Sequence, residues 1–183
     1  YIVFQIAPKI NASGRLEHAS QSVELLISKD EKEVKKFAND IDIINHTRKK
    51  TDGNVTEEAI QLIIDQKEED NYSTVIYDAN WHKGVLGIVA SRLIDTYYRP
   101  TLVLTDGNEG EITGSARSIK DFDIYEVIDQ CSDLLLRYGG HQFAAGLTMK
   151  KENLAAFKER FENLDHYLHD LQKSGNKKDD NYK

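Results

Sequence analysis

The segment best suited to chemistry is Tyr138–Gly146, YGGHQFAAG, in which two glycines precede a histidine and three small residues close the motif. Gly139 and Gly140 permit positive φ and leave backbone N–H groups unshielded, a pattern typical of an anion nest. His141 can donate to a phosphate oxygen or protonate a leaving group. Gly139 alone is better explained as the cap of a preceding helix. The six small or polar residues together favour a binding site.

A second candidate is Trp81–Arg92, WHKGVLGIVASR, which we expect between the carboxyl end of a strand and the start of a helix. Open α/β sheets commonly bind ligands there, because a helix N-terminus offers free N–H groups and partial positive charge to an anion. The alternative is structural: Trp81 and His82 would pack under the loop, and Gly87 would allow close contact between helix and sheet. We expect that structural role for Gly87, and both roles stay open for His82.

A third motif is Gly114–Ser118, GSARS, in a predicted strand. Side chains alternate along a strand, so Ser115 and Arg117 should share one face. A hydroxyl and a two-pronged guanidinium at that spacing can hold a terminal phosphate. The alternative is an exposed edge strand whose one arginine forms a salt bridge.

A fourth motif is Ile10–Leu16, INASGRL, where Asn11 and Arg15 offer further donors and a hinge or cap is the alternative. The sequence contains no nucleophile elbow, Walker A loop or zincin motif. Its six histidines are scattered, and no cluster of Asp and His resembles a two-metal site. These motifs can therefore hold a phosphate, but none of them would activate water.

Composition narrows the class of protein. The 183 residues are 39% hydrophobic and 30% charged, with a net charge of −7. The single cysteine, Cys131, excludes an internal disulfide and a multi-cysteine metal site. No apolar run approaches the roughly 18 residues of a membrane span, so we expect a soluble, cytoplasmic protein without a membrane partner. Residues 1–72 and 73–149 are each net −4, and any phosphate binding must therefore be local.

The first third of the chain predicts helices. Residues 7–18 have no clear period and suggest an ordered loop, and 19–27 suggest a short helix. From 31 to 69 the apolar positions follow spacings of three and four, which favours one long helix beginning after Asp30. A turn at 52–54 that separates two helices is the alternative.

After residue 72 strands and helices alternate. We expect strands at 74–77, 101–105, 111–117 and 144–149, and helices at 85–98, 123–138 and 152–171. The β-α-β opening implies parallel neighbours, and the glycine-containing link at 106–110 implies an antiparallel hairpin. The predicted fold class is α/β, a mixed sheet of about four to five strands flanked by helices and preceded by a long linker helix. We divide the chain into 1–72, loop and linker helix; 73–172, substrate-binding domain; and 173–183, disordered tail.

The four motifs, in this order, resemble the carboxy-terminal half of the DHH/DHHA1 phosphoesterases. WHKGVLGIVASRL, GSARS and YGGHQFAAGLTM look like the RecJ single-stranded-DNA-specific exonucleases in particular, as does APKINASGRLEHAS ahead of the long helix. The resemblance covers about residues 7–150. GGH followed by AAG alone would also fit oligoribonuclease and cyclic-dinucleotide phosphodiesterase relatives.

The resemblance implies part of a 5′→3′ exonuclease that degrades single-stranded DNA in recombination and repair. In that family a DHH domain holds two Mn²⁺ or Mg²⁺ ions and precedes the linker helix. This chain, which opens on Tyr1, does not contain that domain. We therefore expect a piece of a longer protein that binds no metal and is inactive alone. RecJ-type channels are expected to be basic, and the acidic segments here depart from that pattern.

The resemblance also assigns residues. Ser115 and Arg117 match the pair expected at the 5′-phosphate. The motif expected to contact substrate opposite the metals is matched by Gly139, Gly140 and His141, with His141 as a possible assisting residue. Positions near the cleft are matched by Asn11, Arg15 and His82. A non-enzymatic single-strand-binding module is the remaining alternative, but it needs basic and aromatic stripes. The nine tyrosines and one tryptophan form no such stripe.

Overall fold

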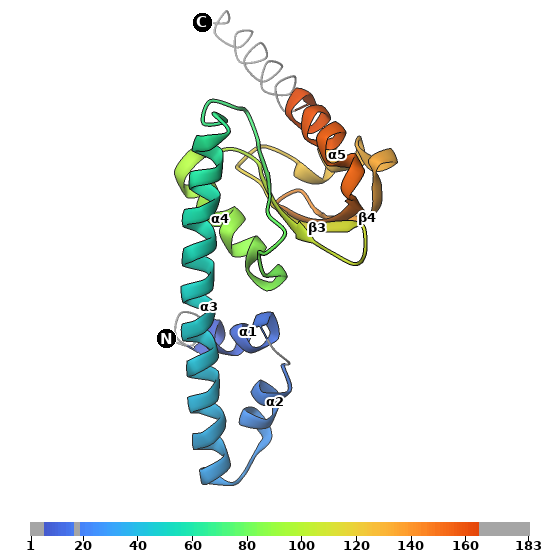
Figure 1. Ribbon diagram of the computed structural model, residues 1–183. Helices are drawn as coiled ribbons and strands as arrows, with labels where there is room; N and C mark the ends of the chain where they lie inside the picture. The colour runs from blue at the N-terminus through green and yellow to red at the C-terminus, as the bar shows by residue number, and fades with distance from the viewer. Residues whose placement is uncertain (1–5, 17–18, 165–183) are drawn as a thin grey trace, which may run out of the picture.

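The computed structural model describes residues 6–16 and 19–164. One long helix, α3 (Glu31–Asp65), runs the length of the molecule, as Figure 1 shows. Two short helices, α1 (Ala7–Leu16) and α2 (Ser20–Ile27), pack against its first half. The α/β lobe lies along its second half. In the part of the chain that the structure describes, none of the helices combines the length and apolarity needed to cross a membrane.

The loop predicted at residues 7–18 is wrong, because α1 occupies most of that segment. Pro8 lies in the first turn of the helix, where its missing N–H leaves no intrahelical bond unmade. Ala12 and Ser13 are fully buried, and the Ser13 hydroxyl contacts that of Ser22 at 2.6 Å. Tertiary packing therefore stabilises a helix that the sequence period does not reveal.

Helix α3 is continuous, which decides between the two predicted alternatives. Asp30 caps it as predicted, its side chain accepting from the backbone N–H of Lys32 at 2.7 Å. Asp52 is fully buried, and its carboxylate pairs with Arg48 at 2.6 Å and with Arg92 at 2.5 Å. A side chain suited to a turn is thus held inside the helix by two guanidinium groups, and the Arg92 contact joins α3 to α4.

The mixed sheet has five strands in the order β1-β2-β3-β5-β4. They are β1 (Thr74–Tyr77), β2 (Thr101–Asp106), β3 (Glu111–Arg117), β4 (Leu135–His141) and β5 (Ala144–Lys150). Strands β1 and β2 are parallel and joined through α4 (Leu86–Tyr97), whereas all other pairs are antiparallel. The predicted fold class, the parallel pair and the β2–β3 hairpin are confirmed.

The predicted helix at 123–138 is wrong in its second half. Helix α5 covers only Ile124–Asp129, a 3₁₀ turn, η3, follows at Ser132–Leu134, and β4 begins at Leu135. The helical period ends at Cys131, which is fully buried. Beyond Cys131 the chain continues as the edge strand β4, whose backbone forms hydrogen bonds with β5. The double glycine consequently lies inside a strand and does not cap a helix.

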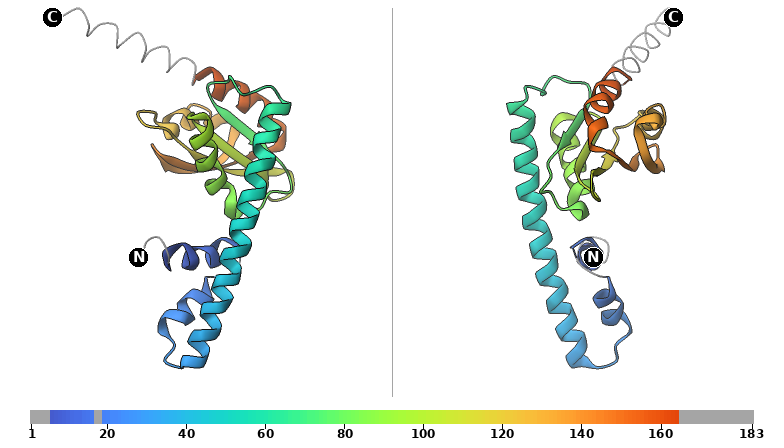
Figure 2. Two further views of the ribbon diagram at one scale, coloured as in Figure 1. Left: turned by 90° about the vertical axis from the view of Figure 1, so that its left-hand side faces the viewer. Right: turned by 45° about the vertical axis from the view of Figure 1, so that its right-hand side comes forward.

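The sheet lies between helices in Figure 2, and an apolar cluster lies on each of its faces. One face packs against α5 and the helix at 154–164, through residues such as Leu102, Ile112, Phe157 and Phe161. The other packs against α4 and α3, through residues such as Val103 and Val89. A 3₁₀ turn, η4 (Lys151–Asn153), starts the last predicted helix, whose residues beyond 164 and whose tail lie outside the described residues.

Candidate functional site

Ser115 and Arg117 lie on the same face of β3 and are half-buried, as the alternation predicts. The Arg117 Nη1 donates to the Ser115 Oγ at 3.0 Å and to the Ala116 carbonyl at 2.7 Å. The serine therefore fixes one edge of the guanidinium. This face is the one that α4 covers, because Val103, which pairs with Ser115, belongs to the α4 cluster.

The first turn of α4 carries Gly87, which lies directly against this pair. A Cβ at Gly87 would be 2.4 Å from the Arg117 Nη2 and 3.0 Å from the Ser115 Oγ. Only a residue without a side chain leaves that space to the guanidinium. The predicted close contact between helix and sheet at Gly87 is therefore confirmed, and the contact also determines where the arginine lies.

The charge of Arg117 has no acidic partner among the described residues. Burial lowers the pKa of its guanidinium, and the nearby positive charge of Arg15 lowers that pKa further. Two arginines thus repel each other at the end of β3. A half-buried cation without a carboxylate is costly, and an anion between the two guanidinium groups would offset that cost.

Arg15 reaches this region from the end of α1. Its Nη1 donates to the Gly84 carbonyl at 3.2 Å. A Cβ at Gly84 would be 1.9 Å from the Arg15 carbonyl oxygen, so glycine allows the 3₁₀ turn η2 (Lys83–Val85) to touch α1. The fourth and second motifs therefore meet at this contact.

The two aromatic side chains before η2 behave differently. Trp81 is buried, as in the structural alternative, and its Nε1 donates to the Glu58 carboxylate at 2.9 Å. His82 does not pack under the loop: it is exposed, and its Nδ1 caps η2 by accepting from the Gly84 N–H at 3.1 Å. His82 also borders a hollow of about 330 Å³ that is otherwise lined by residues of α1 and α3. It therefore lies near the Arg15 contact and is not part of the Arg117 pair.

Strand register brings the glycine–histidine motif beside the serine–arginine motif. His141 pairs with Ala144, which pairs with Arg117 on the other side, so these three form one row across β4, β5 and β3. Laterally paired residues project from the same face. Two strand spacings separate the Cα atoms of His141 and Arg117, roughly 10 Å. The open face between them carries only alanine and glycine side chains.

Within the motif the two glycines have different roles. Gly140 has φ of +154°, and a Cβ there would lie 2.3 Å from the Ala144 carbonyl oxygen, so the hairpin requires glycine. A Cβ at Gly139 would meet nothing within 4 Å. The His141 Nδ1 accepts from the Phe143 N–H at 3.2 Å. The neutral imidazole therefore carries its proton on Nε2, which is free to donate.

Asn11 is the predicted site residue that the structure does not bring to this row. It is exposed on α1, and no described contact joins it to Arg117 or His141. Sequence reasoning in turn missed the close contact between Gly84 and Arg15. It also missed Asp52, whose short side chain resembles a turn former.

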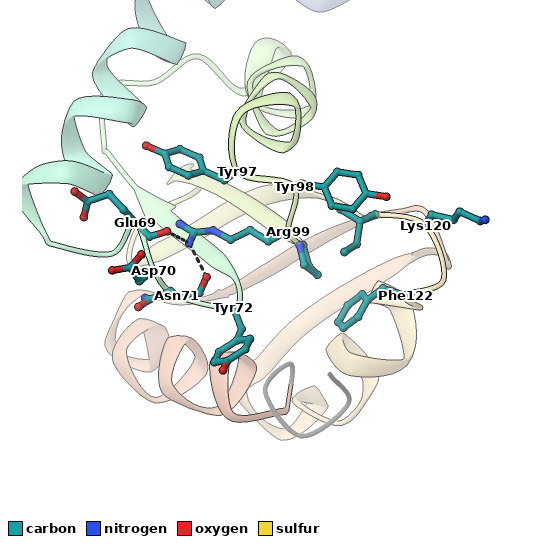
Figure 3. Close-up of a pocket in the computed structure, with 11 residues that line it drawn as sticks. Glu69, Asp70, Asn71, Tyr72, Tyr97, Tyr98, Arg99, Lys120 and Phe122 are labelled. Carbon is teal, nitrogen blue, oxygen red and sulfur yellow. Dashed lines mark hydrogen bonds between the residues drawn. The ribbon is translucent and has the colours of Figure 1, made fainter. Parts of the chain in front are cut away.

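A separate hollow of about 310 Å³ lies where the loop after α3 meets the end of α4 (Figure 3). Its lining includes Tyr97, Tyr98 and Phe122. Its buried cation, Arg99, donates to the carbonyls of Glu69 at 2.8 Å and Asn71 at 2.6 Å. The guanidinium therefore anchors the loop to the sheet, and its bonds are made with the protein itself.

The described residues offer no group of three or more His, Cys, Asp or Glu side chains that could hold a metal ion. The donors gathered at the site are guanidinium, hydroxyl, imidazole and backbone groups, which suit an anion and not a cation.

The fold and this face define a class of protein. Residues 69–164 match the DHHA1 domain, more than half of the chain, and the chain belongs to that family. Members to which it is similar include RecJ exonucleases. It is 42% identical over 162 residues to "Single-stranded-DNA-specific exonuclease RecJ" of Bacillus subtilis, covering 88% of this chain and 20% of that protein. The corresponding figures for the Haemophilus influenzae protein are 38%, 86% and 29%.

Solved structures agree with this assignment. RecJ from Thermus thermophilus in complex with Mg²⁺ superposes with a TM-score of 0.82 at 32% identity, covering 91% of this chain and 26% of that one. The complex with Mn²⁺ gives a TM-score of 0.81, covering 91% and 24%. The chain thus spans about a fifth to three tenths of the length of these relatives.

Proposed function

We propose that this chain is the substrate-binding part of a single-stranded-DNA exonuclease and that Arg117 and Ser115 bind the 5′-phosphate of the strand. The observation that carries the proposal is the half-buried Arg117 guanidinium, hydrogen-bonded to Ser115 and facing no carboxylate among the described residues. A phosphate has the negative charge and the pair of acceptor oxygens that a planar guanidinium can bind through two parallel N–H bonds.

The neighbouring groups fit the same ligand. Arg15 adds a second positive charge, which attracts the phosphate dianion. His141 presents its Nε2–H from the far side of the alanine and glycine floor and can donate to the next phosphate oxygen. Because these groups are local while the chain is net −7, binding should depend on few phosphates.

The division of labour in the intact protein is part of the proposal. Residues 1–72 form the linker arm and 73–172 the substrate-binding domain. The relatives' names support single-stranded DNA as substrate, and two of their structures contain Mg²⁺ or Mn²⁺. In the intact protein the divalent ions belong to a preceding DHH domain, which supplies the hydrolytic chemistry. The residues described here hold the strand end.

Binding of short oligothymidylates to this chain tests the proposal. A 5′-phosphorylated oligonucleotide should bind at least tenfold more tightly than its 5′-hydroxyl counterpart, since a charge-assisted contact contributes about 1.5–3 kcal/mol. Arg117→Ala should remove that difference. Equal affinity for both oligonucleotides, or preference for a cyclic dinucleotide, would reject the 5′-phosphate site in favour of the small-nucleotide relatives.

A further inference from the structure

We propose that Arg137, together with Thr113 and Thr148, forms a second phosphate subsite that holds the DNA backbone behind its 5′-end. This inference rests on the proposed function, because it takes the Arg117 row as the position of the 5′-phosphate. It adds a residue to the binding surface and assigns a direction to the bound strand.

The register places this second group on the same face as the first. Arg137 pairs with Thr148, and Thr148 pairs with Thr113, in a row parallel to the one that contains His141 and Arg117. The two rows are four residues apart along the strands, or roughly 13–14 Å. That span suits the first few nucleotides of an extended strand.

Between the two rows lies the pair Gly139 and Gly146, next to Ser115 on the same face. Both glycines are exposed. A Cβ at Gly139 would meet nothing within 4 Å, and one at Gly146 would come only to 3.7 Å from the Gly114 carbonyl oxygen. Neither glycine is required by packing or by positive φ, although glycine destabilises a strand by roughly 0.5–1 kcal/mol. The pair leaves an unobstructed path from Arg117 to Arg137.

Arg137 is available to a ligand at the end of that path. Its side chain is 65% exposed, and a β-bulge between Leu135 and Arg137 interrupts the strand just before it. Bulges often re-aim a side chain. The Arg137 Nε lies 3.3 Å from the Thr148 Oγ1, which is in turn 3.2 Å from the Thr113 Oγ1. These groups border a hollow of about 280 Å³.

Glu111 is the group that opposes an anion here. Its Oε2 accepts from the Arg137 Nη2 at 3.2 Å, which occupies one edge of the guanidinium. Among the described residues no other carboxylate pairs with Arg137. A phosphate would therefore share Arg137 with Glu111. Removing the Glu111 charge should strengthen the subsite, which gives the proposal a prediction of gained affinity as well as lost affinity.

The test measures binding of the full chain to a 5′-phosphorylated pentathymidylate. One series of ligands carries a neutral methylphosphonate at each linkage in turn. The variants are Arg137→Ala, Glu111→Gln and, as a control, Arg160→Ala. Arg160 is also paired with a carboxylate, Asp133, but lies on the helix at 154–164 that covers the opposite face.

For the wild-type chain, one methylphosphonate within the first three linkages should weaken binding about three- to tenfold. In Arg137→Ala the unmodified ligand should bind more weakly by a similar factor, and the same methylphosphonate should cost nothing further. The slope of log K against log salt should fall by about 0.7. Glu111→Gln should bind more tightly than wild type, and Arg160→Ala should bind as wild type does.

The outcomes separate the two proposals. If the 5′-phosphate and Arg117 matter but Arg137→Ala and Arg160→Ala both leave affinity and salt slope unchanged, the subsite is wrong and the proposed function stands. If the 5′-phosphate has no effect, or the chain does not bind the ligand, both proposals are wrong. Melting temperatures of the variants within a few degrees of wild type confirm that a lost contact, not a lost fold, is measured.

Discussion

The guanidinium of Arg117 occupies the space that a side chain at Gly87 would fill, with a Cβ there only 2.4 Å from the Arg117 Nη2. Helix α4 of one motif and strand β3 of another therefore pack closely together at the Arg117 guanidinium. The contact explains how two motifs 30 residues apart in sequence meet on one surface, where we propose that an anion binds.

Substituting Gly87 should impair binding without unfolding the lobe. In Gly87→Ala the new methyl group displaces the end of a flexible side chain, which costs the fold little, while alanine favours the helix. We expect affinity for a 5′-phosphorylated oligonucleotide to fall about tenfold and the melting temperature to change by no more than a few degrees. Gly53→Ala, in α3 where a Cβ would meet nothing within 4 Å, is the control: it should bind normally. Unchanged affinity in Gly87→Ala would show that the space at Gly87 is not needed for phosphate binding.

The two glycines of the histidine motif should respond oppositely to alanine. Gly140→Ala places a Cβ 2.3 Å from the Ala144 carbonyl oxygen at φ of +154°, and should destabilise the protein by about 2 kcal/mol or more. Gly139→Ala should leave stability unchanged or slightly raised. Urea denaturation measures both, and equal midpoints for the two variants would contradict the assignment.

Asp52 should be the most important single carboxylate of the arm for stability. Asp52→Ala leaves Arg48 and Arg92 without their buried partner, which should cost about 3 kcal/mol of unfolding free energy. Asp42 in the same helix pairs with Lys9 at the surface, with side chains 53% and 42% exposed. Asp42→Ala should cost under about 1 kcal/mol. The account of α3 fails if the two variants lose equal stability in the same denaturant series.

Cys131 should make the protein less stable in alkali. Burial raises the pKa of its thiol from 9.0 to about 11. The folded state therefore favours the protonated thiol, and the stability it contributes is complete below pH 9 and lost as the pH rises through 11. Unfolding free energy measured from pH 8 to 11 should fall more steeply for wild type than for Cys131→Ala. Parallel curves would show that the thiol titrates alike in both states.

Sequence periodicity predicted most of this fold because the long helix and the first three strands carry their own signals. The β-branched run at 74–77 and the strand at 111–117 have the predicted bounds. The misassigned segments depend on partners distant in sequence. Helix α1 is stabilised by burial of Ala12 and Ser13. The segment of β4 is a strand and not a helix because β5 supplies its hydrogen-bond partners.

For the candidate site, too, local features were predicted from the sequence and contacts between distant segments were not. Residue type and alternation predicted that Ser115 and Arg117 share a face, since both facts are local. The row that joins Arg117 to His141 depends on the register of three strands, which no local pattern specifies. The role of Gly84 arises from contact with Arg15, 69 residues away, and that contact also lies beyond local patterns.

In the proposed site Arg117, held by Ser115, binds the terminal phosphate, and Arg15 adds its positive charge. The most direct measurement is NMR of arginine Nε–H signals in the full chain during titration with a 5′-phosphorylated dithymidylate. The account predicts that the signals of Arg117 and Arg15 shift together and saturate, and that the 5′-hydroxyl dinucleotide leaves them in place. Saturable binding that moves other arginines and leaves these two unchanged would contradict it.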